Sequence, residues 1–174
     1  MKERGRTLAD EQQDGSVEGR RVAWRGAIKM AERYPLTGVG LGSFMCALQD
    51  FIDTNPRVAH NTFFQFLGEN GVGAAFCYVM IICTFLISSR RIGAWCKART
   101  GHPDLPVVEQ LNNASTASFL GLVVCSFFLT LNNYEIFYYL VIINSALTVL
   151  CLRSSAKEAS PVEEAQTSGF PLPA

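Results

Sequence analysis

The chain has 174 residues, of which 49% are hydrophobic and 17% charged, and its 15 basic and 15 acidic residues balance to zero net charge. A neutral chain gives no electrostatic reason to expect nucleic acid as a partner, and we predict none. Six cysteines without CxxC spacing and only two histidines exclude the usual zinc patterns. We therefore expect no metal and no cofactor. The first twenty residues are polar, without the apolar core of a signal peptide.

Residues 16–34 have the pattern of an amphipathic helix that ends before Pro35, since proline cannot continue a helix. Ser16 is the predicted cap at its start. Apolar side chains recur at the i, i+3, i+4, i+7 spacing of one helix face, namely Trp24, Ala27, Ile28 and Ala31. A basic stripe runs beside them, formed by Arg21, Arg25, Lys29 and Arg33.

The basic stripe has two interpretations. A solvated face, or one that binds anionic lipid head groups, explains most of it. Arginine is also the residue best suited to a bidentate grip on phosphate oxygens. Arg20 stands one turn before Trp24 at the edge of the apolar face, where a solvated surface explains it less well. We predict Arg20 as a phosphate ligand, with Arg21 and Arg25 in support.

A glycine-rich segment, "LTGVGLGSF", follows Pro35 and predicts a tight turn, with a short helix over 44–52 after it. The "GVGLG" within it has neither the GxGxxG spacing nor the lysine of nucleotide-binding loops, so nucleotide binding is excluded.

His60 and Asn61 come directly before a helix that we expect to begin at Thr62. The ordinary interpretation of His60 is a loop or capping residue. The alternative is a general base, because imidazole ordinarily has a pKa of about 6.5 and can accept a proton at neutral pH. Asn61, which can hold a ligand hydroxyl, and Glu69, two helical turns further on, favour the alternative. Glu69 can equally be an interfacial carboxylate without a role.

Three apolar segments without Asp, Glu, Lys or Arg follow, and each has about the 20 residues needed to cross a bilayer. They are 71–89, 114–133 and 136–152. Basic residues follow the first and third segments, and we therefore expect the C-terminal ends of these two segments to lie on the cytoplasmic side. We therefore predict an all-α integral membrane protein: an outside helical region over 1–70, three transmembrane helices over 71–152, and a disordered cytoplasmic tail over 153–174.

In order along the chain, these motifs resemble the C-terminal part of the O-antigen ligase and polymerase family of bacterial polytopic membrane glycosyltransferases. The first motif is "S..GR...W", followed by "P-L-x-G-x-G-x-G-x-F", "HN" and "E-x-G". The residues that carry them are Ser16, Gly19, Arg20, Trp24, Pro35, Leu36, Gly38, Gly40, Gly42, Phe44, His60, Asn61, Glu69 and Gly71. The resemblance covers about residues 14–90.

The resemblance implies transfer of a glycan from undecaprenyl diphosphate to a lipid or glycan acceptor, on the periplasmic face of the inner membrane, without a metal. Arg20 corresponds to a phosphate-binding arginine and His60 to the catalytic histidine. Family members have about ten or more spans, so we expect this chain to be the C-terminal part of a longer protein, inactive alone or half of a split enzyme. The competing hypothesis is a non-catalytic membrane subunit or scaffold whose basic helix binds anionic lipid.

Overall fold

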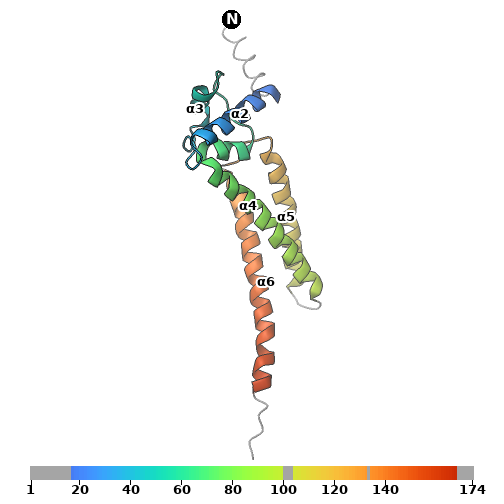
Figure 1. The fold of residues 1–174 in the computed structure, drawn as a ribbon. Coiled ribbons are helices and arrows are strands. Elements are labelled where there is room, and N and C mark those ends of the chain that lie inside the picture. Colours follow the sequence, from blue (N-terminus) through green and yellow to red (C-terminus); the bar gives the residue numbers. More distant parts are fainter. Residues whose placement is uncertain (1–16, 100–103, 133, 168–174) are drawn as a thin grey trace, which may run out of the picture. The chain divides into compact units, whose positions relative to one another are not determined.

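Five α-helices follow one another in the computed structural model, which describes residues 17–99, 104–132 and 134–167 (Figure 1). They are α2 (Val17–Arg33), α3 (Phe44–Phe51), α4 (Thr62–Ala98), α5 (Leu105–Ser126) and α6 (Glu135–Thr167). No strand occurs within these ranges. The predicted all-α class is confirmed, and so are the helix before Pro35, the short helix after the glycine turn and the helix start at Thr62. The predicted cap Ser16 lies outside the described residues.

The described residues form two compact units. The first contains residues up to Cys83 together with Leu120–Glu135, and the second contains Thr84–Phe119 and the residues from Ile136 onward. In the first unit α2 packs on α3 around fully buried side chains, including Ala23, Met30 and Leu48. Gly26 allows this close crossing, since a Cβ there would overlap the Leu48 side chain.

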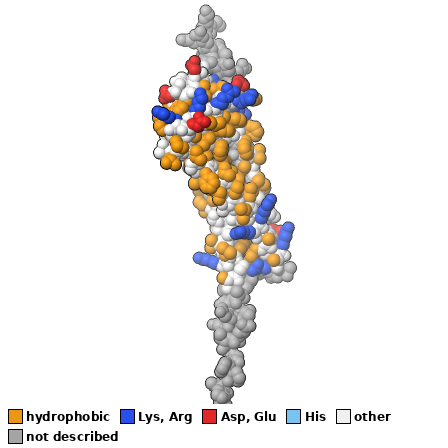
Figure 2. Space-filling view, viewed as in Figure 1, with side chains coloured by type: hydrophobic (Ala, Val, Ile, Leu, Met, Phe, Trp, Pro, Cys, Tyr) orange, Lys and Arg blue, Asp and Glu red, His pale blue; other side chains and the backbone are white. Residues whose placement is uncertain are grey.

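The stripe predicted for α2 is rotated from the one observed. Ala27 and Ala31 are buried as predicted and Trp24 is partly buried, but Ile28 is 44% exposed, and Ala23 and Met30 take its place in the core. All four residues of the basic stripe are exposed. On the face shown in Figure 2, charged side chains gather over the α2–α3 part of the first unit.

Helix α4 is broken at Gly71, whose backbone is non-helical (φ 79°, ψ −174°). The glycine turn compensates for the break by supplying hydrogen bonds to it. The amides of Val39 and Gly40 donate to the carbonyls of Gly68 and Glu69, each at 2.9 Å, and the amide of Val72 donates to the carbonyl of Pro35 at 2.8 Å. The apolar pattern predicted a membrane span from Gly71 onward but did not predict this break.

In the second unit, parts of three helices meet at polar and aromatic contacts. The side-chain Nδ2 of Asn144 donates to the Ser89 hydroxyl at 2.9 Å, and Nδ2 of Asn112 donates to the Ser89 backbone carbonyl at 3.2 Å. The Phe119 ring stacks on Phe85, with centroids 3.7 Å apart, and lies 5.1 Å from the Phe137 ring centroid. Interhelical side-chain amide bonds of this kind are typical of membrane helix packing.

Two of the described helices are long and apolar enough to cross a membrane: α4, and α6 over Glu135–Ala156. Large side chains on α4 are exposed, among them Val72, Phe76 and Met80, and a water-soluble chain rarely leaves such a row uncovered. The segment 114–133, predicted as a third span, is helical only to Ser126. Beyond it the chain turns, and Asn61 and Thr62 bind the carbonyls of Phe127 and Leu129.

Helix α6 continues beyond Leu152, where the sequence analysis predicted a disordered tail. The Ser155 hydroxyl accepts hydrogen bonds from Trp95 Nε1 at 3.0 Å and from the Arg99 guanidinium at 2.9 Å, and itself donates to the Cys151 carbonyl. These contacts explain why the first turn of the predicted tail is helical instead. Residues 168–174 lie outside the described residues.

Candidate functional site around His60

His60 is the one non-glycine residue with positive φ (47°) in the described ranges. Histidine enters this left-handed region more readily than most residues, but it still does so uncommonly. Backbone conformations of this kind persist only where the surroundings impose them, and they are concentrated at functional sites. The side chain is partly exposed and makes no hydrogen bond or ion pair with the described residues. Its ring nitrogens are therefore available to a ligand.

The residue before His60 is held at both of its backbone groups. The carbonyl of Ala59, which is fully buried, accepts a hydrogen bond from Trp24 Nε1 at 2.9 Å. Its amide donates to Gln65 Oε1 at 3.3 Å. The Trp24 ring in turn stacks on Phe64, with centroids 5.0 Å apart and planes 13° apart. Helix α2 and the start of α4 thereby fix the loop on the N-terminal side of His60.

The residue after His60 caps α4. Asn61 Oδ1 accepts the amide hydrogen of Phe64 at 3.2 Å, as an N-cap residue does. Asn61 Nδ2 donates to the Phe127 carbonyl at 3.3 Å, and only 5% of the residue is exposed. The predicted role of Asn61 in holding a ligand hydroxyl therefore competes with two structural bonds.

Arg20 is partly buried on α2, one helical turn before Trp24. Its Nε atom is buried and has no hydrogen-bond partner among the described residues. A buried charged donor without a partner is costly, because the water it loses is not replaced. The contact between Trp24 and Ala59 brings the helix that carries Arg20 to the loop that carries His60.

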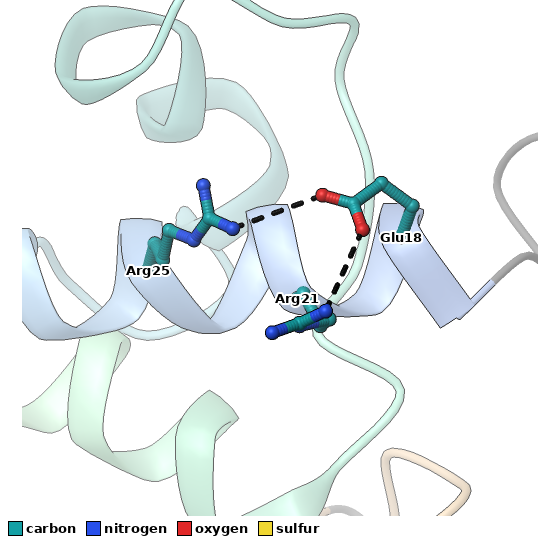
Figure 3. A network of polar contacts seen from close by, with 3 residues as sticks. All are labelled: Glu18, Arg21 and Arg25. Carbon is teal, nitrogen blue, oxygen red and sulfur yellow. Dashed lines mark ion pairs between the residues drawn. The ribbon is translucent and has the colours of Figure 1, made fainter.

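Arg21 and Arg25 differ from Arg20 in their surroundings. Both pair with Glu18, at 3.9 Å and 3.7 Å, as Figure 3 shows. Their side chains are 62% and 61% exposed, so the ion pairs are surface contacts of small energetic value. The three arginines thus divide into one with a buried, unpaired donor and two on a solvated face.

Glu69 is 1% exposed and lies next to the break in α4. Its Oε1 atom accepts hydrogen bonds from Gln65 Nε2 at 2.6 Å and from the Phe44 amide at 3.3 Å. Its Oε2 atom is buried without a partner in the described part of the chain. Because Gln65 also binds Ala59, Glu69 is connected to the loop of His60 through one side chain.

A cavity of about 840 Å³ lies in the first unit between α2, the glycine turn and α3. Its lining includes Lys29, Arg33, Tyr34 and Asp50, but neither Arg20 nor His60. Within the described ranges, no group of three His, Cys, Asp or Glu side chains has the arrangement needed to hold a metal ion. The chemistry that the site residues themselves offer is an imidazole, a guanidinium and buried amide and carboxylate groups.

Sequence reasoning missed two residues of this site as contacts of the His60 loop: Gln65, and the indole N–H of Trp24. Neither contact has a local signal. Trp24 and Ala59 are 35 positions apart, and Gln65 appears only as one polar residue in "TFFQFLGENG".

One comparison with known proteins matches the part of the chain that contains these residues. The family model described as O-Antigen ligase matches residues 1–79, a range that contains α2, α3, His60 and the break at Gly71. No curated protein and no solved structure matches the chain. Over residues 1–79, this chain is therefore similar to the O-antigen ligase family.

Proposed function

We propose that the chain takes part in transferring a glycan from undecaprenyl diphosphate to an acceptor hydroxyl, as a ligase or a polymerase, on the periplasmic face of the bacterial inner membrane. The observation that carries the proposal is the hydrogen bond between Trp24 and Ala59, which joins the helix of Arg20 to the loop of His60 within the matched domain. Lipid-linked glycans are the substrates that the family implies. In the proposed topology, the region before Gly71 lies on the periplasmic side, and three segments, one of them in α5, cross the membrane.

The chemistry assigned to His60 is that of a general base. The acceptor hydroxyl oxygen attacks the anomeric carbon of the donor sugar, and His60 takes the hydroxyl proton. The bond between that carbon and the phosphate oxygen breaks, and its electron pair leaves with undecaprenyl diphosphate. A positioned general base typically raises the rate of such a step by about 10²- to 10⁴-fold.

The role assigned to Arg20 is to bind the diphosphate. A guanidinium stabilises the negative charge that gathers on the leaving group, and it does so best in a site shielded from water. The buried, unpartnered Nε of Arg20 fits this role, because a phosphate oxygen would supply the missing acceptor. Arg21 and Arg25 assist by attracting the anionic head group.

The experiment is a transfer assay in membranes that contain the chain as part of an active longer protein, supplied with an undecaprenyl-diphosphate-linked glycan and the acceptor. We expect His60→Ala to abolish transfer and the matched variant His102→Ala to retain it, with both proteins inserted equally. Transfer at the normal rate by His60→Ala would remove the assignment of His60 as the base.

The second candidate is a non-catalytic subunit or scaffold whose basic helix binds anionic lipid. The exposure of Arg21 and Arg25 on one solvated face favours it. Phosphatidylglycerol that copurifies with the chain would then fall in the double variant Arg21→Gln/Arg25→Gln, while His60→Ala would change nothing. Loss of transfer in His60→Ala would decide against this candidate.

A further inference from the structure

We propose that Trp24 and Gln65 are positioning residues that impose the left-handed backbone of His60 and thereby aim its imidazole. Trp24 and Gln65 would thus belong to the site around His60. Their effect on catalysis rests on the proposed function of that site. The structural claim can be tested without any transfer reaction.

The backbone torsion φ of His60 turns about the N–Cα bond that follows the Ala59–His60 peptide. Trp24 holds the carbonyl of that peptide at 2.9 Å, and Gln65 holds the amide of Ala59 at 3.3 Å. Both bonds act on a fully buried residue, where water cannot replace a lost partner. The peptide on the N-terminal side of His60 therefore cannot rotate freely.

The two positioning side chains are themselves held in place by neighbouring side chains. The Trp24 ring is stacked on Phe64, so its indole N–H points in a fixed direction. The Gln65 amide nitrogen donates to Glu69 Oε1 at 2.6 Å, and this fixes which end of the amide faces Ala59. Gln65 is 5% exposed and Glu69 is 1% exposed, so the chain of contacts is shielded from solvent.

The C-terminal side of His60 is anchored independently, because Asn61 caps α4 and its backbone carbonyl accepts a hydrogen bond from the Gln65 backbone amide at 3.0 Å. His60 is thus a single strained residue between two fixed neighbours. If one anchor is removed, the backbone can relax toward negative φ, and the ring is then carried away from its original direction.

The experiment uses the full chain in lipid nanodiscs with selectively ¹⁵N-labelled histidine. The chain has two histidines, so the spectrum contains a signal from His60 and an internal reference from His102. Trp24→Phe removes the indole donor but keeps a ring to stack on Phe64. Gln65→Met removes the amide and keeps the approximate shape. The matched control is Trp95→Phe, which likewise removes one indole hydrogen bond, to Ser155, in the second unit.

We expect Trp24→Phe and Gln65→Met each to shift and broaden the His60 signal, while His102 and the far-UV circular dichroism stay as in the wild type. Trp95→Phe should leave the His60 signal unchanged. The inference is overturned if His60 is unaffected by both variants, or if His60 and His102 change together as in general unfolding.

In the transfer assay, both variants should lower kcat about tenfold or more with KM nearly unchanged, because a misdirected base affects the reaction step and not donor binding. If the His60 signal moves as expected but His60→Ala retains transfer, the positioning holds and the proposed function fails. The two claims are thereby separated.

Discussion

Gly38 lies directly against the backbone of Glu69. A Cβ at position 38 would overlap the carbonyl of Glu69 and the amide of Asn70, and the φ of Gly38 is +61°. The glycine turn and the break in α4 are therefore packed backbone to backbone at this point. The family resemblance accounts for a glycine here by motif, and the structure gives its physical reason.

Gly38→Ala should destabilise the first unit strongly. Gly42→Ala is the matched control, because Gly42 also has positive φ (+74°) but has open space where a Cβ would lie. We expect about 1 kcal/mol for the control from backbone strain alone, and about 1–3 kcal/mol more for Gly38→Ala from the overlap. Thermal midpoints of both variants in the same detergent measure the difference. Equal midpoints would show that the turn does not pack on Glu69.

Replacing Asn61 should weaken the start of α4. Asn61→Ala removes the acceptor for the Phe64 amide and the donor to the Phe127 carbonyl, at a cost of about 1–2 kcal/mol. Asn61→Asp keeps the capping oxygen and should cost less. Hydrogen exchange of the Phe64 amide is the measurement, and it should accelerate in Asn61→Ala but hardly in Asn61→Asp. Unchanged exchange in Asn61→Ala would contradict the capping role.

Glu69→Ala should cost more than Glu69→Gln. The alanine variant leaves the Phe44 amide and the Gln65 amide group without their common acceptor, at about 1–3 kcal/mol for each buried donor. Glutamine retains an acceptor oxygen at the same position. Denaturant midpoints compare the two variants. If they are equally stable, the Oε1 contacts contribute nothing and Glu69 must be explained by another role.

Arg20→Lys and Arg21→Lys should differ in the transfer assay although both keep the positive charge. Lysine lacks the Nε–H of arginine and cannot make the bidentate contact, so Arg20→Lys should raise the donor KM about tenfold or more. Arg21→Lys should change it little, since Arg21 is exposed and pairs with Glu18. Equal effects of the two substitutions would remove the distinction drawn between these arginines.

Asn144→Leu should loosen the helix packing in the second unit. It removes the hydrogen bond to the Ser89 hydroxyl, and such interhelical bonds are worth about 0.6 kcal/mol on average and up to about 2 kcal/mol. Ser145→Ala serves as control, because the Ser145 hydroxyl is exposed and bonds within its own helix. Thermal midpoints in detergent should fall for the first variant only. If both midpoints fell by the same amount, the loss of stability would come from a change within helix α6 and not from the lost hydrogen bond to Ser89.

Local signals in the sequence predicted the end of α2 and the start of α4. Pro35 marks the end of α2 two residues after Arg33, and Asn61 before "TFFQ" gives the start of α4. The resemblance over residues 14–90 is confirmed where the family model matches, over 1–79. The assignments of His60 and Arg20 remain predictions, with the contacts described above as their support.

The remaining features depend on contacts between distant parts of the chain. Periodicity cannot show that the backbone groups at the Gly71 break form hydrogen bonds with a turn about thirty residues earlier in the chain. Hydropathy gave the apolar segment 114–133 but not its helix end at Ser126, because apolar residues after Ser126 are held in a turn by Thr62. Gln65 lies only six residues after Ala59, but a single polar residue in "TFFQFLGENG" gives no sequence signal for their contact.

The meeting of Asn112 and Asn144 at Ser89 also has a consequence for assembly. A helix that slips along its neighbour by one residue moves about 1.5 Å, enough to break a hydrogen bond of 2.9 Å or 3.2 Å. The hydrogen bonds at Ser89 therefore fix the axial register of the α5 segment that carries Asn112 and of the α6 segment that carries Asn144. Slippage of either segment would leave a side-chain amide without a hydrogen-bond partner in an apolar environment. Insertion intermediates with the wrong register are therefore higher in free energy.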